Sequence, residues 1–150
     1  MTRHPRSLSR PLSRRQFLGR SAAAAGVFGL PAIVPASALG LAGAPAPSNR
    51  VVLGCIGLGI QGMGNMRTFR GNPEVQVVAV CDVHETRRLA GKQSVDEYYD
   101  NQDCAAYRDF RELMARKDID AVQITAPDHW HPRMALEATR QRKHMYCEKP

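Results

Sequence analysis

Apolar runs and helix-forming segments alternate along the chain from residue 50 onward. Apolar runs bounded by Gly, Asp or charged residues are typical of strands buried on both faces of a sheet. Such runs predict strands at residues 50–57, 75–82, 105–107, 120–125 and 144–148. The segments between them predict helices at residues 60–70, 84–99, 108–117 and 131–143. In the helix at 84–99 we expect Leu89 and Val95 to contact the core.

The alternation of strands and helices decides the predicted fold class. Successive strands joined by helices form a parallel sheet with helices on both faces. We therefore predict an α/β, doubly wound, Rossmann-type nucleotide-binding domain over residues 50–150. Its last strand, at 144–148, would be an apolar edge, which promotes aggregation when nothing covers it. This pattern predicts a domain that is incomplete at its C-terminus within these 150 residues.

Charge is distributed unevenly along the chain. The net charge is +7, yet residues 1–49 hold six Arg and no acidic residue. Residues 50–150 carry fifteen Lys and Arg against fourteen Asp and Glu, so the predicted domain is nearly neutral. The basic charge belongs to the N-terminal segment, and we expect no nucleic-acid partner.

The first 38 residues have the three parts of an export signal. A twin-arginine pattern, "SRRQFLG", occupies residues 13–19, an Ala- and Gly-rich run occupies 21–34, and "ASA" at 36–38 suits a signal peptidase. The run of 14 residues is shorter than the about 20 that a spanning helix needs. We predict a disordered or helical twin-arginine signal peptide at 1–38 and a Gly/Ala/Pro linker at 39–49. A disordered basic tail is the alternative.

Export would place the protein in the periplasm or outside the cell, with the twin-arginine export machinery as a partner. In an oxidising compartment, four cysteines can form two disulfides. However, Cys55, Cys81 and Cys147 lie in apolar runs, and neither they nor Cys104 form a CxxC pair. Buried free cysteines behave as small apolar residues. We therefore expect four free, buried thiols.

A glycine motif follows the first predicted strand. Gly57, Gly59 and Gly62 have G-x-G-x-x-G spacing, and the second strand ends in Asp82, twenty residues after Gly62. The first Gly permits the tight turn, the second lets a pyrophosphate approach the backbone, and the third lets helix and strand pack closely. Unpaired N–H groups at a helix start bind phosphates. The alternative is a doubly wound domain with a Gly turn and no nucleotide.

The residue types around this motif favour NAD as the cofactor. The Asp82 carboxylate can accept hydrogen bonds from ribose hydroxyls and would repel a 2′-phosphate, which makes NADP the less favoured cofactor. Arg87 and Arg88 follow closely and would soften that preference. Ile60 and Gln61, inside the glycine motif, are further candidate cofactor contacts.

A second group of candidates, "TAPDHWHP" at residues 125–132, follows the fourth predicted strand. Ligands of open α/β sheets bind beyond the carboxyl ends of the strands. Trp130 offers a flat apolar face to a nicotinamide or sugar ring, and His129 lies beside it. H-x-H with no further ligands is a weak metal pattern, so we expect no metal. His131 either lines the cofactor site or forms a local hydrogen bond at the helix start.

The chain ends in "HMYCEKP", so Glu148, Lys149 and Pro150 follow the fifth predicted strand and reach the same edge of the sheet. A lysine beside a nicotinamide can hydrogen-bond the substrate hydroxyl that becomes a carbonyl. The alternative for an isolated E-K-P is a solvated chain end. Its position after a strand of the predicted sheet favours a catalytic role for Lys149.

Together these segments resemble the Gfo/Idh/MocA family, the relatives of glucose–fructose oxidoreductase and inositol dehydrogenase. The matching segments, in family order, are "GCIGLGIQG", "VVAVCDV", "DAVQITAPDHWHP" and "HMYCEKP". The resemblance implies that Lys149 contacts the substrate. It also implies that Thr125, Pro127, His131 and Glu148 line the cofactor cleft, and the "HWH" variant is similar to that of exported members thought to act on sugars.

The resemblance implies an exported NAD-dependent oxidoreductase that acts on a sugar or polyol hydroxyl by hydride transfer. Family members are much longer, and their second domain supplies most substrate contacts and a histidine that works with the lysine. We therefore expect the isolated 150 residues to bind NAD weakly without turnover, and the full-length protein to form a homo-oligomer. The alternatives are a redox-assisted glycosidase, which oxidises a sugar transiently, and a non-catalytic sensor.

Overall fold

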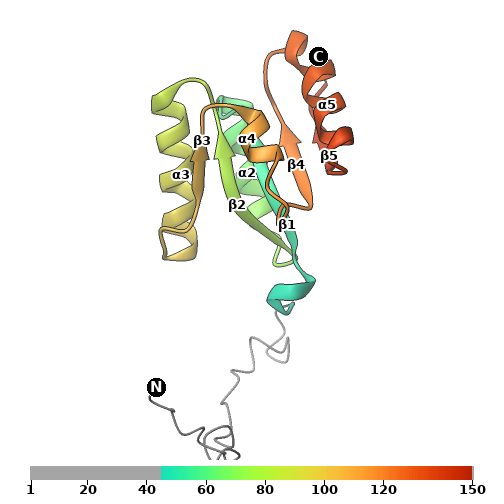
Figure 1. Cartoon of the computed structure of the whole chain (residues 1–150). Helices are drawn as coiled ribbons and strands as arrows, with labels where there is room; N and C mark the ends of the chain where they lie inside the picture. Colours follow the sequence, from blue (N-terminus) through green and yellow to red (C-terminus); the bar gives the residue numbers. More distant parts are fainter. Residues whose placement is uncertain (1–44, 150) are drawn as a thin grey trace, which may run out of the picture. The chain divides into compact units, whose positions relative to one another are not determined.

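The computed structural model describes residues 45–149, and the predicted leader, most of the linker and Pro150 lie outside them (Figure 1). Every predicted strand and helix in this range is confirmed, with α4 and α5 shorter than predicted. The elements are η2 (Pro47–Asn49), β1 (Val51–Ile56), α2 (Ile60–Arg70), β2 (Val75–Cys81), α3 (Glu85–Tyr99), β3 (Ala105–Tyr107), α4 (Phe110–Met114), β4 (Ala121–Ile124), η3 (Asp128–Trp130), α5 (His131–Arg140) and β5 (His144–Cys147).

The five described strands form one sheet in the order β3-β2-β1-β4-β5, and every neighbouring pair is parallel. This confirms the predicted doubly wound, Rossmann-type fold class. The chain moves outward from β1 to β3 and then returns to place β4 on the other side of β1. The connections that leave β1 and β4 therefore part in opposite directions, which opens a crevice at the carboxyl ends of these strands.

Each face of the sheet is covered by two helices and has its own core (Figure 1). On one face, Met66 of α2 and Val95 of α3 pack against apolar residues of β1 and β2. On the other face, Leu113 of α4 and Met134 of α5 pack against Ile124 of β4 and its neighbours. The near-continuous apolar runs of the central strands follow from this double burial.

The prediction that Leu89 contacts the core is wrong, because its side chain is 54% exposed. Helix α3 packs on the sheet through Gly91 and Val95, which are one turn apart on the same face. A Cβ on Gly91 would lie 2.6 Å from Cδ1 of Leu58, so the helix approaches this side chain closely. Leu89 lies outside that face.

The cysteine prediction is confirmed except at one position. All four cysteines are free, and burial raises the pKa of the Cys81 thiol to about 12 and that of Cys104 to about 11. Cys55 is also fully buried, and its pKa is raised by the same cause. Cys147 is exposed, against prediction, because β5 is the outermost of the described strands and all four of its residues are exposed.

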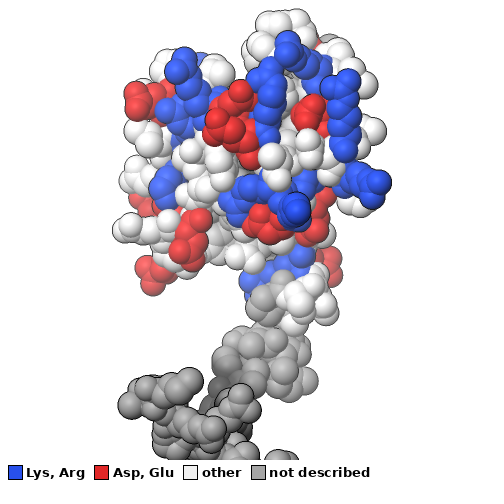
Figure 2. All heavy atoms as spheres, in the orientation of Figure 1, with Lys and Arg blue, Asp and Glu red and all other residues white. Residues whose placement is uncertain are grey.

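The described surface carries charges of both signs. Figure 2 shows Lys and Arg side chains interspersed with Asp and Glu on the face drawn. Among residues 45–149, no helix has the length and apolar character needed to cross a membrane.

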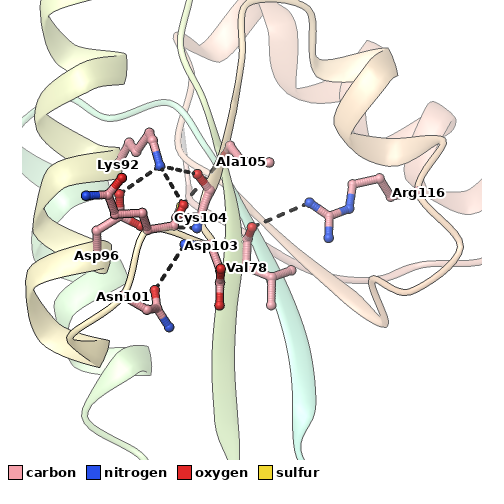
Figure 3. Close-up of polar contacts among 9 residues, drawn as sticks. Val78, Lys92, Asp96, Asn101, Asp103, Cys104, Ala105 and Arg116 are labelled. Atoms are coloured by element: carbon pink, nitrogen blue, oxygen red, sulfur yellow. Dashed lines mark hydrogen bonds and ion pairs between the residues drawn. The ribbon is translucent and has the colours of Figure 1, made fainter.

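Lys92, in the middle of α3, bonds to the segment that leads from α3 to β3 (Figure 3). Its Nζ donates to Oδ2 of Asp96 at 2.7 Å, to the carbonyl oxygen of Cys104 at 2.7 Å and to that of Gln102 at 3.2 Å. Asp96 Oδ1 in turn accepts a hydrogen bond from the backbone N–H of Cys104. The ammonium thus satisfies two carbonyls of the connection between α3 and β3.

We predict that Lys92→Met lowers the free energy of unfolding by about 1–3 kcal/mol, because it leaves these carbonyls and the Asp96 carboxylate without their charged donor. Urea denaturation followed by circular dichroism measures the change. Gln93→Met, on the exposed side of the same helix, is the control and should have little effect. Equal stability of the two variants would contradict the prediction.

Candidate cofactor and catalytic site

The glycine loop between β1 and α2 lies directly against the end of β4. Gly57 has a φ of +83°, and a Cβ there would lie 2.4 Å from the carbonyl oxygen of Thr125. The backbone N–H of Thr125 donates to the carbonyl of Ile56 at 2.8 Å, which holds the two strands together at this level. A Cβ on Gly62 would lie 1.9 Å from the carbonyl oxygen of Gly57. Side chains at these two positions would therefore force the loop off the sheet.

Gly59 faces open space instead. A Cβ there would meet no atom within 4 Å, and its φ of −67° suits any residue. Gly59 is the N-cap of α2 and gives no side-chain hydrogen bond to the first turn, which also lacks acidic residues. Ile60 is 99% exposed and Gln61 is also exposed. The helix start therefore offers uncapped N–H groups and room beside Gly59, as a dinucleotide pyrophosphate requires.

Asp82 lies at the end of β2 beside this loop and is only 8% exposed. Its Oδ2 accepts a hydrogen bond from the backbone N–H of Leu58, and its Oδ1 accepts one from that of His84, both at 2.8 Å. Arg88 donates to the backbone carbonyl of Asp82 at 2.8 Å, while Arg87 is exposed. The carboxylate is thus fixed at the edge of the crevice, where each oxygen keeps a second lone pair for a ribose hydroxyl.

Gln123 links the glycine loop to the end of β4 from inside the fold. Its side chain is completely buried, and its Nε2 donates to the carbonyl of Gly62 and to Oγ1 of Thr125, each at 3.0 Å. Its Oε1 is buried with no hydrogen-bond partner among the described residues. A buried amide that bonds both sides of the crevice fixes their separation.

The candidate site residues after β4 differ in their burial and contacts. Buried His131 bonds through Nε2 to the carbonyl oxygen of Ala126 at 2.7 Å, so it forms the local hydrogen bond that was one of its two predicted roles. Pro127 and His129 are exposed. Trp130 is 37% exposed, and the centroid of its ring lies 6.2 Å from that of Phe110 in α4. The structure thus groups Trp130 with α4 and α5.

The end of β5 is joined to α2 by polar side chains. Oε2 of Glu148 accepts hydrogen bonds from Nδ2 of Asn65 and from the hydroxyl of Tyr146, both at 2.9 Å. These two bonds, the Asn65 bond first, hold the pKa of Glu148 below its usual value. Lys149 is exposed, and its charge and backbone N–H also favour the ionised Glu148.

Sequence reasoning missed three of the residues in these contacts. Gln123 is a polar residue in the middle of an apolar strand, and that pattern itself indicates a special role. Asn65 lies four residues after Gln61 on α2, which places both on one helix face. Tyr146 had no such signal, because a tyrosine in an edge strand is ordinary. Among residues 45–149, no three His, Cys, Asp or Glu side chains are grouped to hold a metal ion.

A family model described as "Oxidoreductase family, NAD-binding Rossmann fold" matches residues 51–150. The chain belongs to the Gfo/Idh/MocA family. Its described part is thus an NAD-binding Rossmann domain, and the uncapped start of α2, the space at Gly59 and the fixed Asp82 carboxylate fit that cofactor.

Relatives of this Gfo/Idh/MocA chain carry both dehydrogenase and glycosidase names. It is 34% identical to a glycosyl hydrolase family 109 protein of Saccharopolyspora erythraea, over 96% of this chain and 34% of that one. It is 32% identical to an alpha-N-acetylgalactosaminidase of Shewanella oneidensis, over 77% and 26% of the two chains. A Lactobacillus casei myo-inositol dehydrogenase, solved with NAD(H) and myo-inositol, matches with TM-score 0.58 at 26% identity, over 67% and 29%. The chain spans about a third or less of each.

We predict that Gly59→Ala weakens NAD binding at least about tenfold and lowers the free energy of unfolding by about 1 kcal/mol or less, since Ala is a poorer N-cap than Gly. The new methyl group would occupy the open space beside the helix start and meet no protein atom. Fluorescence titration with NADH and a thermal melt measure the two effects. Gly64→Ala is the matched control, because its methyl group also meets nothing within 4 Å but lies in the second turn of α2. NADH affinity unchanged by Gly59→Ala would contradict the assignment of the pyrophosphate site.

Proposed function

We propose that the full-length protein is an NAD-dependent oxidoreductase that acts on a hydroxyl group of a sugar or polyol. The observation that carries this proposal is the hydrogen bond between Asn65 and Glu148. It ties the end of β5, and with it Lys149, to the helix whose start binds the cofactor phosphates. Members of the family that carry dehydrogenase names, including one solved with NAD(H) and myo-inositol, support the choice of a polyhydroxylated substrate.

The residues of this chain would divide the work as follows. The glycine loop, the start of α2 and Asp82 bind and orient the cofactor, which, when bound, accepts hydride from the carbon that bears the reacting hydroxyl. Lys149 hydrogen-bonds that hydroxyl and shares its proton as the carbonyl forms. Thr125 and Pro127 line the cleft between them, while Trp130 and His129 border its substrate side. Holding both reactants at attack distance supplies much of the rate gain.

A second candidate function is redox-assisted glycoside cleavage, in which the sugar is oxidised only transiently. The relatives named glycosyl hydrolase family 109 protein and alpha-N-acetylgalactosaminidase favour it. The two candidates differ in products. With 4-nitrophenyl N-acetyl-α-galactosaminide a glycosidase releases nitrophenol without net NADH, whereas a dehydrogenase forms NADH with myo-inositol. If neither probe reacts, a sensor without catalysis becomes the better proposal.

For either enzyme we predict that Lys149→Ala lowers kcat by about 10²- to 10⁴-fold, the usual range for a lost acid–base group, and leaves the Kd for NAD unchanged. Turnover of the reactive probe and NADH titration measure the two quantities. Lys117→Ala, another exposed lysine, is the control. Full activity of Lys149→Ala would overturn the catalytic assignment of this lysine.

We further propose that residues 1–38 direct export through the twin-arginine route to the periplasm or beyond, and that the exported full-length protein is a homo-oligomer. The "SRRQFLG" pattern supports the export proposal.

The export proposal predicts that replacing Arg14 and Arg15 together by Lys retains the protein in the cytoplasm. The paired arginines are the part of the signal that this route recognises. Immunoblots of periplasmic and cytoplasmic fractions of a cell with an active twin-arginine pathway measure the distribution. Arg3→Lys with Arg6→Lys, outside the pattern, is the control. Unchanged export of the Arg14 and Arg15 variant would refute the proposed route.

A further inference from the structure

One stripe of helix α2 faces the end of β5. Gln61, Asn65 and Phe69 are spaced by four residues, which places them one above another on the helix surface. Gln61 Nε2 donates to Oδ1 of Asn65 at 3.0 Å, and Asn65 Nδ2 donates to Glu148 at 2.9 Å. One turn further on, the ring of Phe69 meets that of Tyr146 edge to face, 5.2 Å between centroids.

We propose that Asn65 and Tyr146 are positioning residues: they hold the Glu148 carboxylate, and through it the end of β5 that carries Lys149, against the cofactor-binding helix. This inference rests on the proposed role of Lys149. It adds to that role a hydrogen-bonded link, from Gln61 in the first turn of α2 to Glu148, between the cofactor site and the catalytic lysine.

The position of β5 in the fold shows why such a link matters. Among the described strands β5 pairs with β4, and this ladder continues to the bond from Glu148 N–H to the carbonyl of Ile124 at 2.9 Å. All four residues of the strand are exposed. The contacts of Glu148 with Asn65 and of Tyr146 with Phe69 add a second restraint on the end of the strand, from the side of the cofactor-binding helix.

Charge makes Glu148 the centre of this link. A single carboxylate oxygen accepts bonds from both the Asn65 amide and the Tyr146 hydroxyl, and hydrogen bonds to an ionised acceptor are stronger than neutral ones. The same donors keep the pKa of Glu148 low, so that the carboxylate stays charged next to Lys149. A fixed negative charge limits the positions that the flexible lysine side chain adopts.

The experiment uses the full-length protein. Tyr146→Phe keeps the ring against Phe69 and removes only the hydroxyl. Asn65→Leu removes the amide donor at similar volume and adds no charge near the phosphate site. Two matched controls lie on α3. Gln93→Leu removes the hydrogen bond that the side-chain amide of Gln93 donates to the Glu97 carboxylate at 2.7 Å. Tyr98→Phe removes the hydroxyl of an exposed tyrosine.

Three kinds of measurement are made. Fluorescence gives the Kd for NADH, NMR of ¹³C-labelled carboxyl groups gives the titration midpoint of Glu148, and steady-state kinetics give kcat and KM for the probe that the wild type turns over. We expect Asn65→Leu and Tyr146→Phe each to raise the titration midpoint of Glu148 and to lower kcat about tenfold, since small misplacements of a reacting group are costly. The Kd for NADH should stay within about twofold. The α3 controls should change none of these quantities.

The outcomes separate this inference from the proposed function. Wild-type kcat in both variants, with Lys149→Ala inactive, would overturn the positioning role and leave the function standing. Loss of NADH affinity that matches the loss of kcat would make Asn65 a cofactor contact and also overturn it. An active Lys149→Ala variant would overturn the catalytic role proposed for Lys149, and with it the role assigned to the link.

Discussion

The cofactor crevice depends on one close approach, that of Gly57 to the backbone of Thr125. A Cβ at Gly57 would lie 2.4 Å from the Thr125 carbonyl oxygen, so the glycine loop and the end of β4 touch backbone to backbone. This contact lies at the point where the strand order reverses, where the connections from β1 and β4 part. Gln123 bonds both sides of it from the core. The loop therefore has one position, and the start of α2 and the Asp82 carboxylate take their positions from it.

Regular elements were predictable because each rests on a pattern that lies within a few consecutive residues. The apolar runs of β1, β2 and β4 follow from burial on both faces, and the glycine spacing follows from the turn that it must form. The prediction that Leu89 contacts the core was wrong because α3 approaches the sheet through Gly91. A contact made by glycine does not appear in a pattern of apolar residues. The prediction that Cys147 is buried was wrong because its apolar run forms the outermost described strand. Its exposure depends on which other elements cover that strand, and the run itself does not determine this.

The candidate site was predictable in part for a similar reason. Residues at strand ends could be assigned to the crevice from topology alone, and the structure brings Gly57, Asp82 and Thr125 to it. Contacts between side chains distant in sequence could not be assigned. Asn65 and Glu148 are 83 positions apart, and their bond depends on where α2 lies on the sheet. The turn of His131 toward Ala126 likewise depends on the local geometry of η3, which composition does not determine.

These contacts differ in how firmly they hold the site. The cofactor side is fixed by backbone contacts and buried side chains, so its geometry resists change. The β5 side, which carries the lysine proposed as catalytic, pairs with β4 among the described strands and contacts α2 through Asn65, Tyr146 and Phe69. Backbone contacts of the first kind resist displacement, whereas side-chain contacts of the second kind adjust more readily. In the proposed mechanism, the precision with which Lys149 meets a substrate therefore depends on the few side chains that join β5 to α2.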